Sequence, residues 1–132
     1  MSTNYKDTFI TASPDSVATQ GKEPAVAHSI AGMQYALLRE RPYTLTSDDL
    51  LFEVHARRNN IADAERQSAR EAFFSKPQAC LRASPLVKQY GWGLHHDGDG
   101  RVAAYGVGTE AYEELLRRSD LKVVAGMRSR KA

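Results

Sequence analysis

Apolar and polar positions recur with two different periods along the chain, and these periods predict both strands and helices. Segment 5–12 (YKDTFITA) alternates like a strand, is rich in Thr, Phe and Ile, and is followed by a Ser-Pro-Asp turn. In segment 26–40 apolar residues recur at helical spacing, with Pro24 placed to open the helix and Pro42 to stop it. We therefore expect a first strand at 5–12 and a core helix at 26–40.

Segment 47–58 (SDDLLFEVHARR) fits two structures, because its apolar residues alternate like those of a strand and also form a helical stripe. Its ends favour the helix. Thr46 or Ser47 can cap it, acidic residues occupy the first turn, and arginines occupy the last turn. We predict a helix over 47–58 and a second one over 62–75 that ends at Pro77, so that the two form a helical hairpin.

Segment 90–107 (YGWGLHHDGDGRVAAYGV) predicts a β-hairpin with Gly98 and Asp99 at its tip. That tip sets the expected pairs, which are His96 with Arg101, Leu94 with Ala103, and Trp92 with Tyr105. The other face then consists mostly of small residues, namely Gly91, Gly93, Ala104 and Gly106. Glycine inside a strand marks a close approach, so we expect either a tightly packed helix or a ligand beside Trp92 against this face.

Two short helices complete the predicted elements. Ser84 and Pro85 have the signature of a helix start, with Gly91 just past its end, and Thr109 can cap a helix that follows the hairpin. The fold class expected is α+β, with a small antiparallel sheet made of the hairpin and strand 5–12, covered by helices. A chain of 132 residues with 42% hydrophobic content suits a single domain over 1–132.

Charge is distributed unevenly along the chain. From Arg117 onward there are six basic residues and one acidic residue, so a basic tail begins at about residue 119. The tail has no aromatic side chains to stack on bases, and Val123 with Val124 looks suited to docking on the body. We therefore do not expect specific nucleic-acid binding. A single cysteine, no signal peptide and no long apolar run predict a cytoplasmic protein that does not contact membranes.

Three near-motifs fail on inspection, and we expect neither a metal nor a cofactor. His95 and His96 are adjacent, so in a strand their side chains point to opposite faces and cannot share an ion. The DGDG stretch lacks the further ligands of a calcium loop. Gly106, Gly108 and Ala111 have dinucleotide-fingerprint spacing, but they follow an antiparallel hairpin and precede several glutamates.

The remaining chemical candidates cluster in segment 80–96. Cys80 is a candidate nucleophile with His95 as its base, although a buried and slowly reacting thiol is the plainer expectation. Arg82 and Lys88 beside a helix start suggest an anion site. The expected ligand-binding residues are Arg82, Ser84, Lys88, Tyr90, Trp92 and His95. These residues favour a domain that binds a small molecule or an anion, and they leave open whether it is an enzyme. The alternative is a non-catalytic interaction module that uses the helical hairpin or the basic tail.

Several stretches also resemble a known family in order and over nearly the whole chain. They are TNYKDTFI, TSDDLLFEVHARR, FFSKPQACLRASPLVKQYGWGLHHDGDGRVAAYG and the closing MRSRK. The chain resembles a family of small uncharacterised bacterial and fungal proteins, described only as a domain of unknown function. The resemblance implies one compact domain. It carries over no activity, partner, cofactor or site residue.

Overall fold

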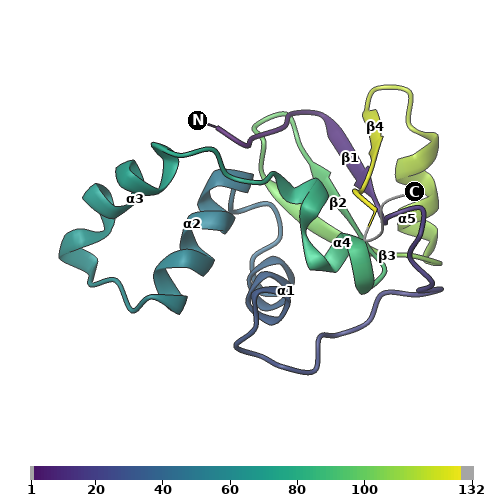
Figure 1. Cartoon of the computed structure of the whole chain (residues 1–132). Coiled ribbons are helices and arrows are strands. Elements are labelled where there is room, and N and C mark those ends of the chain that lie inside the picture. Colours follow the sequence, from purple (N-terminus) through teal and green to yellow (C-terminus); the bar gives the residue numbers. More distant parts are fainter. Residues whose placement is uncertain (1, 129–132) are drawn as a thin grey trace.

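The computed structural model describes residues 2–128 and confirms an α+β fold (Figure 1). Its strands are β1 (Thr8–Thr11), β2 (Trp92–His96), β3 (Val102–Gly106) and β4 (Lys122–Ala125). Its α-helices are α1 (Ile30–Glu40), α2 (Ser47–Arg58), α3 (Arg66–Phe74), α4 (Pro85–Gln89) and α5 (Glu110–Arg117). Two short 3-10 helices, η1 (Asp63–Glu65) and η2 (Leu81–Ala83), precede α3 and α4.

The four strands form one sheet in the order β3-β2-β1-β4, and helices cover both of its faces. β1 pairs antiparallel with β2 and parallel with β4, while β2 and β3 form the predicted hairpin. α1 and α4 lie on one face and α5 on the other (Figure 1). Neighbouring residues of β1 therefore enter different cores: Ile10 packs under α1 and α4, and Phe9 packs with Tyr112 of α5.

The ends of the predicted helices are explained by their caps. α2 spans 47–58 as expected, because Thr46 and Asp49 form a reciprocal capping box. The second helix of the hairpin divides into η1 and α3. α1 begins at Ile30 rather than at residue 26, so the expected start near Pro24 is wrong. The Ser29 hydroxyl caps the helix by accepting a hydrogen bond from the Gly32 amide at 3.0 Å.

The expected register of the β2–β3 hairpin is wrong by one residue. His96 lies opposite Val102, Leu94 opposite Ala104, and Trp92 opposite Gly106. The cause is a longer turn, in which an Asp97 carboxylate oxygen accepts hydrogen bonds from the Asp99 and Arg101 amides at 2.9 Å each. Gly100 takes the left-handed position of this turn at φ 79°.

The corrected register separates the residues expected to form a face of small side chains. Ala104 and Gly106 share a face with Trp92, whereas Gly93 lies on the opposite face beside His95 and Tyr105. Gly93 is nevertheless closely packed. A Cβ atom at this position would lie 2.6 Å from Phe9 and 2.7 Å from Tyr112. Of the two expected neighbours, a helix or a ligand, the structure places α5 against Gly93.

The α2–α3 hairpin extends away from the sheet (Figure 1). No residue of α3 is buried. Its attachment consists of rings and ion pairs at the surface of α2. Phe73 packs edge-on to Phe52 with ring centroids 6.0 Å apart, and Arg70 pairs with Asp49 at 2.9 Å.

The C-terminal segment docks on the body at the valine pair. Val123 and Val124 lie in β4, which pairs in parallel with Phe9 and Ile10 of β1. The basic residues Arg130 and Lys131 lie outside the described part of the chain. Within residues 2–128, no helix has the length and apolar character needed to cross a membrane.

Substituting Gly93→Val is expected to lower the free energy of unfolding by about 3 kcal/mol, because a branched side chain would displace two aromatic rings. Urea unfolding of the purified variants measures this change. Gly98→Val is the matched control, since a Cβ there would approach only a carboxylate oxygen of Asp7, at 3.5 Å. Equal stability of the two variants would show that the Gly93 face is open.

Candidate functional site

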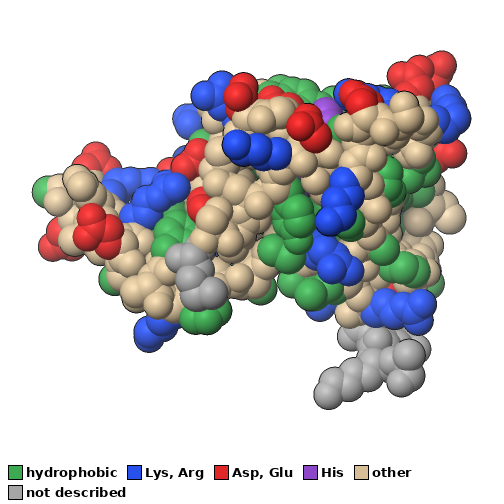
Figure 2. Space-filling model, turned by 90° about the horizontal axis from the view of Figure 1, so that it is seen from above, with side chains coloured by type: hydrophobic (Ala, Val, Ile, Leu, Met, Phe, Trp, Pro, Cys, Tyr) green, Lys and Arg blue, Asp and Glu red, His purple; other side chains and the backbone are tan. Residues whose placement is uncertain are grey.

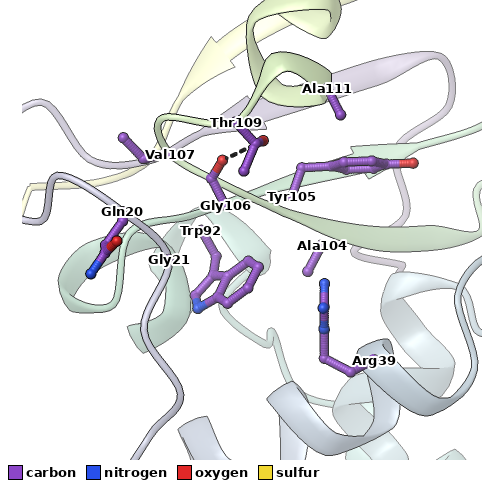
Figure 3. A pocket seen from close by; sticks show the side chains of 10 residues that line it. All are labelled: Gln20, Gly21, Arg39, Trp92, Ala104, Tyr105, Gly106, Val107, Thr109 and Ala111. Carbon is purple, nitrogen blue, oxygen red and sulfur yellow. Dashed lines mark hydrogen bonds between the residues drawn. The ribbon is translucent and has the colours of Figure 1, made fainter.

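A pocket of about 380 Å³ lies beside β3, at one end of the sheet (Figure 3). Its walls come from the loop before α1, from α1 itself, from β2 and β3, and from the start of α5. The lining residues are Gln20, Gly21, Arg39, Trp92, Ala104, Tyr105, Gly106, Val107, Thr109 and Ala111. The volume falls within the range of small-molecule sites.

Arg39 is the one charged side chain among the described residues that line this pocket. Its guanidinium lies 5.3 Å from the Trp92 ring centroid, and the ring of Tyr35, one turn earlier in α1, lies 5.5 Å from the same indole. In residues 2–128 the ion pairs involve the arginines Arg57, Arg66, Arg70 and Arg118, and none involves Arg39. The pocket therefore presents a positive charge supported by aromatic rings.

The backbone around Trp92 holds the pocket in shape. The indole Nε1 donates to the Lys22 carbonyl at 2.9 Å, and the Lys22 amide donates to the Tyr90 carbonyl at 2.8 Å. These bonds fix the loop before α1 against β2. Gly21 is required there, because a Cβ would lie 2.8 Å from the Trp92 ring. The wall is thus preformed by backbone contacts.

Tyr105 connects the pocket to a hydrogen-bonded group on the opposite face of the sheet. The hydroxyls of Tyr105 and Tyr43 lie 2.6 Å apart, and the Tyr43 hydroxyl lies 2.7 Å from Nδ1 of His95. Tyr43 adopts a left-handed backbone at φ 57° in the α1–α2 loop, and its amide donates to the Val102 carbonyl at 2.9 Å. The three side chains form one network that ends at the pocket.

Burial controls the proton equilibria of this network. His95 is 7% exposed, and its Nε2 has no hydrogen-bond partner. Burial lowers the pKa of His95, and the nearby Arg118 guanidinium lowers it further. Burial and the hydrogen bond with Tyr105 raise the pKa of Tyr43. His95 and Tyr43 are therefore neutral near pH 7 and hold a hydrogen bond rather than a charge.

His96 has a separate environment on the other face. It is completely buried, its Nδ1 lies 3.2 Å from the Leu94 carbonyl, and its ring packs edge-on to Tyr5. Burial lowers the pKa of His96 to about 4. The Tyr5 hydroxyl in turn donates to Sγ of Cys80 at 3.2 Å. Cys80 is half-buried, and it contacts Tyr5 on the His96 side of the sheet, away from the His95 imidazole.

The structure does not gather the expected ligand-binding residues into one cavity. Trp92 lines the pocket, but His95 points to the opposite face of β2. Ser84 is buried, caps α4 and donates to the Gln34 side chain at 2.6 Å. Arg82 Nε donates to the Ala125 carbonyl at 2.7 Å. Lys88 and Tyr90 are half-buried in and after α4. Ligand binding by these residues stays a prediction.

Sequence reasoning missed Arg39, Tyr43 and Tyr105 as functional residues. Arg39 follows Tyr35 by four positions, a spacing that places both side chains on one helix face, and this signal was available. No local signal marks Tyr43, because its role depends on its left-handed backbone and on the true hairpin register.

Charges elsewhere are mixed. In residues 2–128 no group of three metal-ligating side chains occurs. On the face shown in Figure 2, Lys and Arg side chains stand in small separate groups with Asp and Glu among them.

The fold and the pocket together define an α+β domain with a small cationic cavity at one edge of its sheet. A family model matches residues 1–132, and the chain belongs to that family, the family of unknown function DUF6157. Searches of curated proteins and of solved structures find no match.

Acidification from pH 7 to pH 4 is expected to lower the free energy of unfolding by about 3 kcal/mol through His96. Between the unfolded pKa of His96, near 6.5, and its folded pKa of about 4, the unfolded chain binds a proton and the folded chain does not. The free energy of unfolding therefore decreases as the pH is lowered through this range. Urea unfolding at a series of pH values measures the loss. A His96→Leu variant loses most of this dependence, and His28→Gln, which alters an exposed histidine, keeps it. An unchanged slope in His96→Leu would contradict the assignment.

Proposed function

We propose that this domain binds a small organic anion in the pocket beside β3. The observation that carries the proposal is the exposed Arg39 guanidinium, which lies over the Trp92 ring in the wall of the pocket and has no carboxylate partner in the described part of the chain. A cation in a pocket wall without an ion-pair partner favours a negatively charged ligand. The pocket volume of about 380 Å³ suits a metabolite rather than a polymer.

The residues around Arg39 also favour a negatively charged ligand. No acidic side chain lines the pocket among the described residues. Glu23 and Glu40 border an adjoining hollow on the other side of Arg39, but neither forms an ion pair with it. Trp92 is 7% exposed, and the part of its ring that lines the pocket would contact the uncharged part of a ligand.

A panel of small carboxylates and phosphate esters, each paired with its neutral amide or alcohol, tests the proposal. We expect at least one anion to raise the melting temperature and its neutral partner to have no effect, because a ligand that binds only the native state stabilises it. Arg39→Met should lower the affinity for that anion by about tenfold or more, as measured by calorimetric titration.

Arg41→Met is the matched control, because Arg41 lies two residues further on, is exposed and does not line the pocket. It should leave the affinity unchanged. If both substitutions weaken binding equally, the effect is one of general charge and the site assignment fails. If no anion in the panel binds, the proposed function fails.

A second candidate function is an interaction module formed by the α2–α3 hairpin. The observation that favours it is an open groove of about 510 Å³ between these helices, lined by His55, Ala69, Ala72, Phe73, Ser75, Lys76 and Gln78. α3 has no buried residue, so it contributes little to the core. A helix that adds little to the core and leaves apolar side chains at the surface is available for contacts with a partner.

Sedimentation velocity tests whether that partner is a second copy of the chain. We expect self-association through the groove to depend on protein concentration and to be abolished by Phe73→Ser. Glu71→Ser, an exposed change on the same helix, serves as the control. A wild-type protein that stays monomeric at all concentrations excludes a second copy as the partner.

A further inference from the structure

β3 is the end strand of the sheet, and its outward edge is open over a short stretch. In the register with β2, the Val107 amide donates to the Gly91 carbonyl, and the Asp97 amide donates to the Arg101 carbonyl. Hydrogen-bonded positions alternate along an antiparallel strand. The backbone groups of Val102, Ala104 and Gly106 therefore point away from the sheet.

One of these three residues has partners for both groups, and a second has one for its carbonyl. The Val102 carbonyl accepts from the Tyr43 amide and its amide donates to the Leu45 carbonyl, each at 2.9 Å. The Gly106 carbonyl accepts from the Thr109 hydroxyl at 2.8 Å (Figure 3). Among residues 2–128, no residue outside the sheet bonds to the amide or the carbonyl of Ala104 or to the amide of Gly106, and both residues line the pocket.

The pocket therefore presents free backbone hydrogen-bonding groups and a cationic side chain side by side. Ala104 offers one donor and one acceptor, the pair that the N–H and the carbonyl or carboxylate oxygen of one extended residue would satisfy. Figure 3 shows the Arg39 side chain rising from α1 with its guanidinium directed toward Ala104. A carboxylate adjacent to the amide would reach that cation.

The ends of the open edge limit the length of the ligand. On one side the Tyr43–Leu45 segment occupies the positions beside Val102. On the other side β3 ends at Gly106, whose carbonyl is bonded by Thr109 in the turn that leads to α5. The free edge is therefore limited to Ala104 and the Gly106 amide, which is too short for a long peptide to pair along β3.

We propose that the pocket binds an N-acylated amino acid, whose N–H donates to the Ala104 carbonyl and whose carboxylate accepts from the Ala104 amide and pairs with Arg39. This inference rests on the proposed function and names the ligand class of the same site. The acyl group and the amino-acid side chain would then lie against Trp92 and Tyr105, the two rings that flank the edge.

Calorimetric titration with four probes separates the two interactions. N-acetyl-L-alanine carries both groups, its methylamide lacks the carboxylate, pentanoate lacks the amide, and N-acetyl-N-methyl-L-alanine lacks the amide hydrogen. We expect N-acetyl-L-alanine to bind at least tenfold more tightly than each of the other three. Arg39→Met should lower the affinity for N-acetyl-L-alanine at least tenfold and leave the affinity for the methylamide unchanged. Arg41→Met should change neither affinity.

A second measurement reads the backbone directly. In ¹⁵N-labelled protein, saturation with N-acetyl-L-alanine should shift the amide proton of Ala104 downfield, because its N–H gains an acceptor. The amide of Val102, which already donates to Leu45, is the internal control.

The outcomes distinguish the two proposals. If pentanoate binds as tightly as N-acetyl-L-alanine, through Arg39, the anion site stands and the N-acylated amino acid is wrong. If N-acetyl-L-alanine binds without moving the Ala104 amide signal, the edge pairing is wrong. If neither compound binds but another anion does, the ligand class alone is wrong. If no anion of any class binds, both proposals fail.

Discussion

The Asp97 carboxylate holds the turn of the hairpin, and the length of that turn decides which side chains meet on each face of the sheet. By accepting two backbone amides it fixes Asp97 opposite Arg101. A one-residue shift would turn every side chain of β3 to the other face. Tyr105 would leave Tyr43 and His95, and Ala104 would no longer present its free backbone groups at the pocket. The site therefore depends on a turn at the far end of the hairpin.

The helices of this fold were the most readable part of the sequence. Thr46 and Asp49 supply both halves of a capping box, and this local chemistry fixes α2 where apolar periodicity alone was ambiguous. The turn was harder to read, because DGDG admits both a two-residue tip and the longer loop that Asp97 and Gly100 form. β4 was recognised only as a docking segment. Its strand exists through pairing with β1, far away in the sequence.

The candidate site could be predicted only in part. Trp92 stood out as the one tryptophan beside glycines, and it lines the pocket. The spacing of Arg39 from Tyr35 shows in the sequence that they share a helix face, but nothing local shows that this face meets an indole. Ser84 and Arg82 have the chemistry of an anion site, but the fold uses them to cap α4 and to bond the end of β4. Residue type indicates what a side chain can do, and tertiary contacts decide which of those roles remains available.

The two edges of the sheet also bear on how copies of this protein behave at high concentration. An uncovered edge strand is a template on which another chain can add and begin to aggregate. Here the Tyr43–Leu45 segment covers the start of β3, and Arg82 binds the last carbonyl of β4, at Ala125. These contacts shorten the free backbone that each edge offers to a neighbouring strand. Arg82, expected from the sequence to bind a ligand, thus takes part in covering an edge of the sheet.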